Sequence, residues 1–197
     1  MVSAVLLAAG SSRRMGALNK LLLPFGDRTI VASTAAELVA AHIGEIIVVT
    51  GHEETKVEAA LAGLPVRLAH NPDYESGLTG SIQTGVRHAR GNGYMICLAD
   101  MVLITHDEYA LLNTAFDRQH LLDDRCILVP AFAGRKGNPV IFSSWYRDAI
   151  LRHPEKEGCK SLVQEHSAHR HILPMPTGHV LQDIDLPDDY QRLTRQD

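Results

Sequence analysis

The sequence predicts an α/β fold in which a mostly parallel β-sheet lies between two layers of helices, a three-layer αβα arrangement. Short runs of apolar residues, many of them β-branched, alternate along the 197 residues with segments of helical periodicity. The runs are apolar almost throughout, as expected of strands that are covered on both faces. No internal repeat, low-complexity segment or linker is visible, so residues 1–197 are expected to form a single domain.

The elements of the first half follow from this alternation. The predicted strands share a near-continuous apolar character and are Val2–Leu7, Glu45–Thr50, Val66–Ala69 and Tyr94–Leu98. The predicted helices share apolar residues at helical spacing and are Thr29–Ala41, Glu53–Leu61 and Ser81–Ala89. Turn-forming residues gather in two loops, Gly10–Gly16 and Asn71–Gly80.

The second half continues the pattern with longer helices and shorter strands. Helices are predicted at His106–His120, Ser143–Leu151 and Lys160–His166, with a last one after Pro187. Strands are predicted at Cys126–Pro130, Val140–Phe142 and near His171–Leu173.

Composition argues against several classes of protein. The formal net charge is -4, whereas nucleic-acid binders are more often basic, so no nucleic-acid partner is expected. Cys97, Cys126 and Cys159 form no CxxC pair, which argues against a disulfide framework or a structural zinc site and fits a reducing compartment. The apolar run Val2–Ala9 is too short to cross a bilayer and has no basic segment before it. We therefore expect a cytoplasmic protein without a membrane partner.

Polar residues follow each of the first four predicted strands. They are the segments Gly10–Lys20, Gly51–His52 and Asn71–Ser81, and the single residue Asp100. Ligands of open α/β sheets bind at the carboxyl ends of the strands. We therefore expect these four groups to meet at one edge of the sheet.

The loop after the first strand is the most informative part of the sequence. It reads Leu7-Ala8-Ala9-Gly10-Ser11-Ser12-Arg13-Arg14-Met15-Gly16, with Asn19-Lys20 shortly after. Small residues let a ligand approach the backbone, whose successive N–H groups can hold an anion, and guanidinium groups suit phosphate. The loop is neither a P-loop nor a GxGxxG dinucleotide motif. The alternative is a solvated turn with loose arginines.

Asp100 and two aspartates near the C-terminus are candidate ligands of one metal ion. Asp100 follows an apolar strand, and carboxylates together with substrate phosphates are the ligands that magnesium prefers. Asp183 or Asp185 would supply a second carboxylate; in a strand they would point to the same face, so their spacing does not separate them. The alternatives are that Asp100 is a turn residue and that Asp183 or Asp185 caps the last helix, with Asp188 and Asp189 in its first turn.

Taken together, these motifs resemble the MobA-like NTP transferase family. The signature residues present in the first loop are Leu7, Ala8, Gly10, Ser12, Arg14, Met15, Gly16 and Lys20. The similarity continues through Gly51-His52, Asn71, Tyr74, Gly77, Ser81, Gly85, Asp100-Met101, Gly137-Asn138-Pro139-Val140 and the segment 183–190. Within the family the chain is most similar to the molybdenum cofactor cytidylyltransferase branch. It differs from the family pattern at Ala99, Val102 and Asn138.

The resemblance implies a Rossmann-like fold and a nucleotidyltransferase that moves CMP from CTP to molybdopterin with loss of pyrophosphate. It implies Mg²⁺ as cofactor, held by Asp100 and Asp185 with Asp183 as second choice, and a molybdoenzyme as a possible receiver of the product. The implied catalytic residues are Lys20, Arg14 and Asp100. The implied nucleotide contacts are Leu7, Ala8, Ala9, Gly10, Ser12, Arg14, Lys20, Asn71, Gly80, Ser81 and Asp100. Ala9 favours CTP, since the guanine-selective relatives have glycine at that position.

Other residues have both a binding and a structural interpretation. Arg135, Gly137 and Asn138 lie in a cationic, glycine-rich segment that suits a second phosphorylated substrate; the alternative is a solvated hairpin. Asn71, Ser81 and Gln83 are candidates to bind the nucleotide, although Ser81 could instead start a helix and Asn71 a turn. His166, His169 and His171 are expected to be a surface or partly buried cluster, because no acidic or cysteine partner is suitably spaced for zinc.

Three other functions remain open from the sequence. The donor could be GTP or the acceptor another phosphorylated compound. The chain could also be an oxidoreductase acting on a pterin-like or aromatic compound, or a cofactor-binding protein without catalysis. Retention of Lys20, Asp100 and Asp185 together disfavours the last of these.

Overall fold

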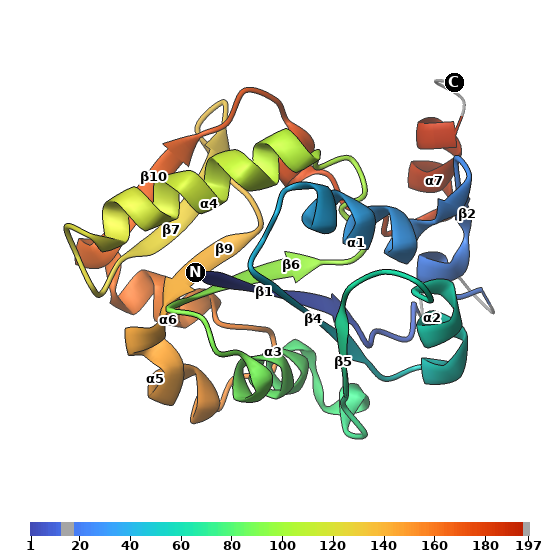
Figure 1. Cartoon of the computed structure of the whole chain (residues 1–197), viewed down its shortest axis with the longest axis horizontal. Helices are drawn as coiled ribbons and strands as arrows, with labels where there is room; N and C mark the ends of the chain where they lie inside the picture. Colours follow the sequence, from blue (N-terminus) through green and yellow to red (C-terminus); the bar gives the residue numbers. More distant parts are fainter. Residues whose placement is uncertain (13–17, 195–197) are drawn as a thin grey trace.

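A computed structural model describes residues 1–12 and 18–194 of the chain. The described residues form three layers, with helices on both sides of one sheet (Figure 1). The sheet has eight strands in the order β10-β7-β9-β6-β1-β4-β5, with β8 paired to β7. The strands are β1 (Val2–Ala8), β4 (Glu45–Thr50), β5 (Arg67–His70), β6 (Gly93–Leu98), β7 (Ile127–Phe132), β8 (Arg135–Lys136), β9 (Val140–Ser143) and β10 (Arg170–Pro174).

Most neighbouring strands run parallel, as predicted. β1 pairs in parallel with β4 and β6, β4 with β5, and β10 with β7. The exceptions are β8 and β9, which run antiparallel to their neighbours. Their direction follows from a tight reversal after β7, where Ala133 and Gly134 both adopt positive φ (49° and 77°).

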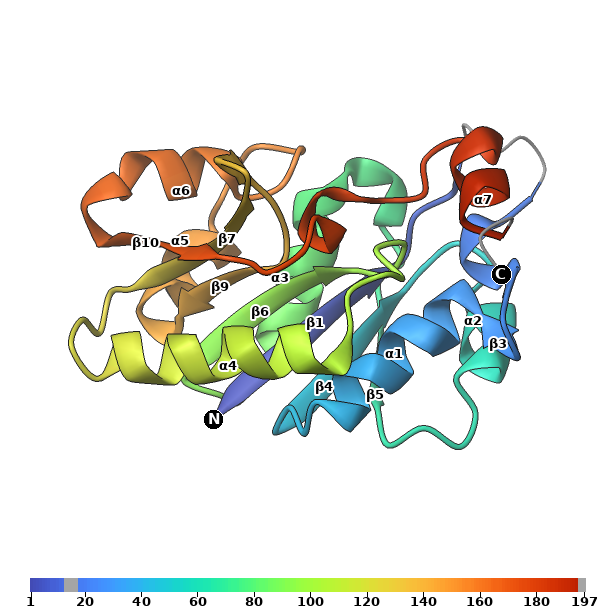
Figure 2. The ribbon, with the colours of Figure 1, turned by 90° about the horizontal axis from the view of Figure 1, so that it is seen from above.

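The helices divide between the two faces of the sheet (Figure 2). On one face lie α1 (Ile30–Ala40), α2 (Glu54–Ala60) and α4 (His106–His120), and on the other α3 (Leu78–His88), α5 (Arg147–Leu151) and α6 (Lys160–Glu165). β1 shows why both layers form: Ala4 and Leu6 pack in the core under α1 and α4, whereas Val5 and Leu7 pack in the core under α3. Alternate residues of a strand point to opposite faces, so a wholly apolar strand needs cover on both.

A small peripheral unit brings a hairpin from the first thirty residues next to the last helix. The hairpin β2 (Pro24–Phe25) and β3 (Arg28–Thr29) lies beside the last helix, α7 (Pro187–Thr194). The Tyr190 hydroxyl donates a hydrogen bond to the Pro24 carbonyl at 2.8 Å. Strands this short have too little apolar pattern to be predicted, and the same is true of β8.

One predicted helix start is wrong. α3 begins at Leu78, three residues before Ser81. Gly77 makes this possible: its φ is +124°, and a Cβ there would lie 2.5 Å from the Lys156 carbonyl oxygen. Ser81 therefore lies inside the helix and is not its cap.

Short 3₁₀ turns replace parts of the predicted loops and helices. The predicted helix Ser143–Leu151 divides into a 3₁₀ turn, Ser144–Tyr146, followed by α5. The other 3₁₀ turns of the described residues are Lys20–Leu22, Tyr74–Ser76, Ser167–His169 and His179–Leu181. Among the helices of residues 1–12 and 18–194, none is both long and apolar enough to cross a lipid bilayer.

Candidate active site

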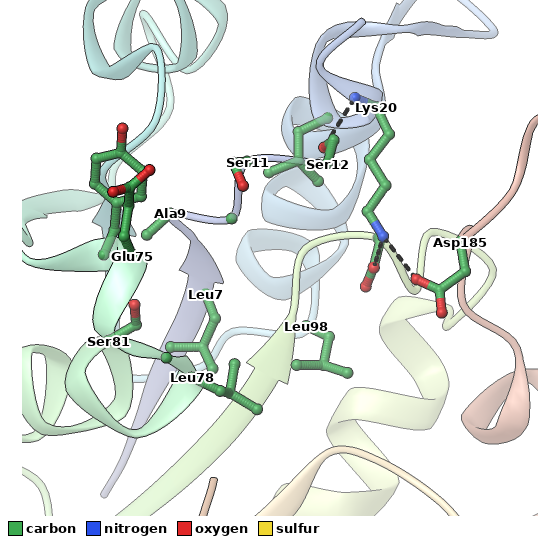
Figure 3. A pocket seen from close by; sticks show the side chains of 15 residues that line it. Leu7, Ala9, Ser11, Ser12, Lys20, Glu75, Leu78, Ser81, Leu98 and Asp185 are labelled. Carbon is green, nitrogen blue, oxygen red and sulfur yellow. Dashed lines mark hydrogen bonds and ion pairs between the residues drawn. The ribbon is translucent and has the colours of Figure 1, made fainter. Parts of the chain in front are cut away.

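A cavity of about 430 Å³ opens at the carboxyl ends of β1 and β6 (Figure 3). Here the first loop, the segment before α3 and the residue after β6 come together, as the strand-end rule predicts. The lining residues are Leu7, Ala9, Gly10, Ser11, Ser12, Lys20, Leu21, Tyr74, Glu75, Gly77, Leu78, Ser81, Leu98, Asp100 and Asp185. We call this space the first cavity.

Lys20 is paired with two carboxylates at one end of the first cavity. Its Nζ lies 2.5 Å from Asp100 Oδ2 and 3.1 Å from Asp185 Oδ1. Burial alone would lower the pKa of the Lys20 ammonium, but the neighbouring charges of Asp100 and Asp185 outweigh burial and raise that pKa. The lysine is therefore a fixed cation at this end of the cavity.

Three carboxylates form a compact acidic group beside Lys20. Asp100, Asp183 and Asp185 each offer an oxygen, and these oxygens lie within 4.8 Å of one another. Burial and then the like charges of Asp185 and Asp100 raise the pKa of the Asp183 carboxyl. Oxygen ligands and an excess of negative charge fit a hard divalent cation such as Mg²⁺ or Mn²⁺. The sequence could not choose between Asp183 and Asp185, and the structure brings both to Asp100.

The backbone holds this acidic group from two sides. The Ala99 amide donates to the Leu7 carbonyl at 3.3 Å, which ties the end of β6 to β1. The Ile184 amide donates to the Asp100 carbonyl at 3.2 Å, and Ile184 is buried between the two tail aspartates. Residues from sequence positions more than 80 apart are thereby fixed next to one another.

Asp189 binds the backbone between the acidic group and the last helix, α7. Its Oδ2 accepts the amides of Leu186 at 2.8 Å and Asp185 at 3.2 Å, and these hydrogen bonds lower the pKa of the Asp189 carboxyl. This carboxylate therefore caps the start of α7. The capping role weighed for Asp183 or Asp185 is carried by Asp189.

The first loop presents small residues and backbone to the cavity. Ser12 adopts a positive φ of 49°, and its Oγ accepts the Lys20 amide at 3.2 Å. Apart from its chain neighbours, no atom of residues 1–12 and 18–194 lies within 4 Å of a Cβ built on Gly10, so these residues leave the space above this glycine open to a ligand. Ala8 is buried and does not line the cavity. Arg14, predicted to be catalytic, lies outside the described residues, as do Arg13, Met15 and Gly16.

The loop before α3 divides into lining and supporting residues. Ser81 lines the cavity, and its Oγ accepts a hydrogen bond from Asn71 Nδ2 at 3.0 Å. Asn71 is buried, and its Oδ1 accepts the Asp73 amide at 3.1 Å, so it supports the loop from behind. Gly80 is also absent from the lining. Gln83 donates to the carbonyls of Ile150 and His153 and is committed to holding α5.

Gly51 and His52 support the first loop without lining the cavity. The His52 amide donates to the Ala9 carbonyl at 3.1 Å. A Cβ on Gly51 would lie 2.7 Å from Tyr74 Cβ and 2.8 Å from Ala9 Cβ. Glycine is therefore needed here for Tyr74 to pack against Ala9.

Leu21 and Leu98 line the cavity but lie outside the segments predicted to meet here. The other lining residues that were not named as nucleotide contacts lie within those segments, Gly10–Lys20 and Asn71–Ser81; they are Ser11, Tyr74, Glu75, Gly77 and Leu78. Leu21 could have been found as the neighbour of Lys20. Leu98 reads as an ordinary strand residue, and only its place at the end of β6 makes it part of the site.

A second cavity of about 450 Å³ adjoins the first, and both are lined by Leu78 and Leu98. The side chains that line its wall are largely apolar, with Ile82, Val129 and Phe142 among them. Three cations, Lys136, Lys160 and Arg170, also lie on the lining, together with one acid, Glu157.

The residues predicted to hold a second substrate lie in and near the second cavity. Gly137 and Asn138 line it, whereas Arg135 is exposed on β8 and does not. Gly137 also has a packing role: a Cβ there would lie 2.0 Å from the Val180 carbonyl oxygen. The hairpin interpretation is also correct, since β7 and β8 form one.

The C-terminal histidines have partners that the sequence did not reveal. His169 Nδ1 lies 2.9 Å and His171 Nε2 lies 3.6 Å from Asp123 Oδ2. His166 packs instead against Trp145 and Tyr146. Asp123 was missed as a partner because it lies 46 residues before His169 in the sequence. Among residues 1–12 and 18–194, the group that meets the spacing for a metal ion is the acidic trio and not these histidines.

Comparison with known proteins agrees with this geometry. The model of the MobA-like NTP transferase domain matches residues 4–171. The chain is 26% identical over 192 residues to the molybdenum cofactor cytidylyltransferase of Escherichia coli (strain K12), covering 96% of this chain and 93% of that protein. It is also 28% identical over 161 residues to the nicotine blue oxidoreductase of Paenarthrobacter nicotinovorans, covering 76% of this chain and 74% of that protein.

Solved structures share the whole fold. A nucleotidyl transferase from Methanothermobacter thermautotroptrophicus (Mth528) superposes with a TM-score of 0.84 at 24% identity, covering 100% of this chain and 99% of the other. Rv0371C from Mycobacterium tuberculosis H37Rv, in complex with manganese, superposes with a TM-score of 0.77 at 21% identity and covers 100% and 99%. The central sheet and its two helical layers are thus those of nucleotidyl transferases of the nucleotide-diphospho-sugar transferase fold.

The family model covers most of the chain and ends at residue 171, within β10 and before the acidic tail. The chain therefore belongs to the MobA-like NTP transferase family and is a nucleotidyltransferase.

Proposed function

We propose that this enzyme transfers CMP from CTP to molybdopterin, or to a closely similar phosphorylated pterin, with release of pyrophosphate. The observation that carries the proposal is the arrangement of Lys20, Asp100 and Asp185 at one end of a cavity that adjoins a second, largely apolar cavity. The E. coli cytidylyltransferase relative, which aligns over 96% of the chain, supports this choice of reaction.

The proposed donor lies in the first cavity with its phosphates at the Lys20 end. Small residues and backbone groups of the first loop then face the base and sugar, and Lys20 neutralises phosphate charge. Arg14, which lies outside the described residues, is proposed to assist it. Ala9 lines the cavity and favours cytosine in the proposed assignment.

Asp100 and Asp185 are proposed to hold Mg²⁺, with Asp183 beside them. The manganese complex of the structural neighbour Rv0371C supports a divalent cation at this fold. When bound, such a cation neutralises phosphate charge and organises the triphosphate. The fit rests on the three clustered carboxylates, whose mutual repulsion a cation relieves.

The proposed acceptor lies in the second cavity. Its apolar wall suits a flat heterocycle, and Lys136, Lys160 and Arg170 suit the acceptor's phosphate. An acceptor phosphate oxygen attacks the α-phosphorus in line, a new P–O bond forms, and the bond to the β-phosphate bridging oxygen breaks. Pyrophosphate leaves with that oxygen. The protein contributes position and charge and needs no nucleophile of its own.

Pyrophosphate release tests the proposal. The purified enzyme, molybdopterin and a divalent cation are incubated with CTP or with GTP, and pyrophosphate and the dinucleotide product are measured. We expect release with CTP that depends on both the acceptor and the metal. Preferential release with GTP would show that the donor is GTP and not CTP. Release that does not depend on molybdopterin would rule out molybdopterin as the acceptor.

The nicotine blue oxidoreductase relative favours one other activity. In that case the second cavity would hold an aromatic substrate, and NAD(P)H would be consumed without pyrophosphate release. A hydride transfer does not need three clustered carboxylates, which is why we prefer the transferase. Nucleotide binding with neither product would indicate a cofactor-binding protein.

A further inference from the structure

Glu108 on α4 is a buried carboxylate that contacts the C-terminal segment leading to the acidic trio. Its Oε2 accepts the Thr105 amide at 3.0 Å and lies 2.9 Å from His179 Nδ1, and its Oε1 accepts the Thr177 hydroxyl at 2.6 Å. Burial alone would raise the pKa of the Glu108 carboxyl, but these hydrogen bonds and the nearby His179 lower it. Glu108 is thus held as a carboxylate with only 4% of its surface exposed.

Helix capping accounts for only one of these three contacts. Thr105 and Glu108 form a capping box at the start of α4, which requires one Glu108 oxygen to reach the Thr105 amide. A capping box does not require burial, and it does not use the second oxygen. The second oxygen, Oε1, accepts the Thr177 hydroxyl. The capping oxygen, Oε2, also lies within hydrogen-bond distance of His179 Nδ1.

We call residues 175–186 the strap. It continues from β10, with the Met175 amide donating to the Ala131 carbonyl at 2.8 Å. After the contacts with Glu108, the Asn138 amide donates to the Val180 carbonyl at 2.9 Å, and the Ile184 amide donates to the Asp100 carbonyl at 3.2 Å. The strap thus passes from the edge of the sheet, over the second cavity's hairpin, to the metal-binding end of the first.

The strap places the aspartates on either side of a single backbone anchor. Asp183 and Asp185 flank Ile184, and their carboxylates lie within 4.8 Å of each other and of Asp100. Three like charges at that spacing repel one another. Lys20 pairs with Asp100 and Asp185 and offsets part of this repulsion, but these two ion pairs do not reach the earlier part of the strap. There Glu108 supplies two contacts through side chains, with Thr177 and His179.

We propose that Glu108 is a positioning residue for the divalent cation site: by holding Thr177 and His179, it fixes the strap so that Asp183 and Asp185 lie beside Asp100. This inference rests on the proposed metal-binding role of those aspartates. Groups that orient metal ligands from outside commonly change metal affinity by about 10- to 100-fold when they are removed.

Glu37 on α1 provides a matched control. Its Oε2 accepts the His106 amide at 2.6 Å and lies 3.0 Å from His106 Nδ1, so it is also a carboxylate paired with a histidine at the start of α4. No hydrogen bond or ion pair recorded for Glu37 involves the described residues of the strap. Glu37→Gln therefore shows how much metal affinity changes when the start of α4 is weakened and the contacts of the strap are kept.

The test is binding of Mn²⁺ alone to the full chain, measured by electron paramagnetic resonance or calorimetry without nucleotide. We expect Glu108→Gln and Thr177→Val to weaken Mn²⁺ binding about tenfold or more, and Glu37→Gln to bind as the wild type does. Thr177→Val leaves the capping box intact and serves if Glu108→Gln fails to fold. In an Asp185→Asn background, Glu108→Gln should cost less than in the wild type, because the two act on one site.

Two results separate the possible failures. If Asp100→Asn and Asp185→Asn weaken Mn²⁺ binding while Glu108→Gln and Thr177→Val bind like Glu37→Gln, the positioning role is wrong and the metal site stands. If Asp100→Asn and Asp185→Asn bind Mn²⁺ as tightly as the wild type, the metal assignment itself is wrong, and the role of Glu108 falls with it.

Discussion

The two cavities share a wall at Leu78 and Leu98 but differ in what lines them. The first gathers Lys20 and carboxylates at the ends of two parallel strands, β1 and β6. The second is mostly apolar and is built from the antiparallel strand β9, the β7–β8 hairpin and α6, with cations among its lining residues. Opposite charges thus meet at one end of the first cavity, whereas mostly cationic charges border an apolar wall in the second.

Because the two cavities are lined differently, we expect substitutions in each of them to change a different kinetic quantity. Changes at the charged end of the first cavity should lower turnover, because they remove groups that we propose stabilise the transition state. Changes in the second cavity should weaken acceptor binding and leave the donor unaffected. If substitutions in one cavity changed both turnover and acceptor binding, the two cavities would not have separate roles.

The largest expected effect is at Asp100. Asp100→Asn removes a carboxylate that pairs with Lys20 and belongs to the acidic trio. A bound metal contributes several kcal/mol to charge stabilisation, so kcat should fall on the order of a thousandfold. Steady-state pyrophosphate release measures this, with circular dichroism to check the fold. Asp117→Asn, at an exposed position of α4, is the charge-matched control. Magnesium-dependent activity close to wild type in Asp100→Asn would remove this residue from the mechanism.

The second effect concerns the acceptor side. Arg170 is half-buried at the start of β10 and lines the second cavity, whereas Lys136 and Lys160 are more exposed. Loss of a hydrogen bond to a charged group costs about 1.5–3 kcal/mol, so Arg170→Met should raise the acceptor KM about 10- to 100-fold and leave the CTP KM unchanged. Arg152→Met, directly after α5, is the control, since among the described residues Arg152 forms an ion pair only with Asp148. An equal rise in the CTP KM would contradict the division between the cavities.

A third effect is on the free energy of unfolding and concerns Glu108, which contacts the strap between the two cavities. The pKa of Glu108 is lowered in the folded protein. Its contribution is therefore present above the pKa of the unfolded chain and is lost as pH falls through the lower folded pKa. Glu108→Gln should be less stable than the wild type by about 2 kcal/mol at pH 7, on the scale of hydrogen bonds to a charged group. Thermal melts should show this gap narrowing in acid, and a gap that stayed constant down to pH 3 would contradict the assignment.

The smallest effect is on the choice of base. Ala9 lines the first cavity, whereas Ala8 is buried on the opposite face of β1. A single methyl contact discriminates weakly, so Ala9→Gly should lower the CTP-to-GTP ratio of kcat/KM by about tenfold at most. Ala8→Gly removes the same methyl group from the side away from the ligand and should leave the ratio unchanged. A shift of equal size in both variants would indicate a general loosening of the loop.

Parts of this site could be predicted because their signals are local. Gly10, Ser12 and Lys20 lie in one segment shortly after a strand, and Asp100 lies two residues after the end of another. Strand–helix alternation then brings both to the same edge, since parallel strands end on the same side. The mostly parallel sheet with helices on both faces follows from the same alternation and is confirmed.

The partners of other residues could not be predicted, because the contacts join separate segments of the chain. Asn71 and Gln83 carry amides that suit a nucleotide, yet one supports Ser81 and the other holds α5. α3 starts before Ser81 because Gly77 reverses the chain against Lys156. Nothing near these residues in the sequence indicates their partners.

The sequence by itself determined the alternation of elements, the loop that presents backbone and cations at the end of β1, and the carboxylate at the end of β6, because each depends on neighbours within a few residues. Only the tertiary structure decided that Asp183 and Asp185 both reach Asp100, that Glu108 holds the strap carrying them, and that a second cavity adjoins the first. Those features depend on contacts between segments tens of residues apart, and their positions are set by packing of the whole sheet.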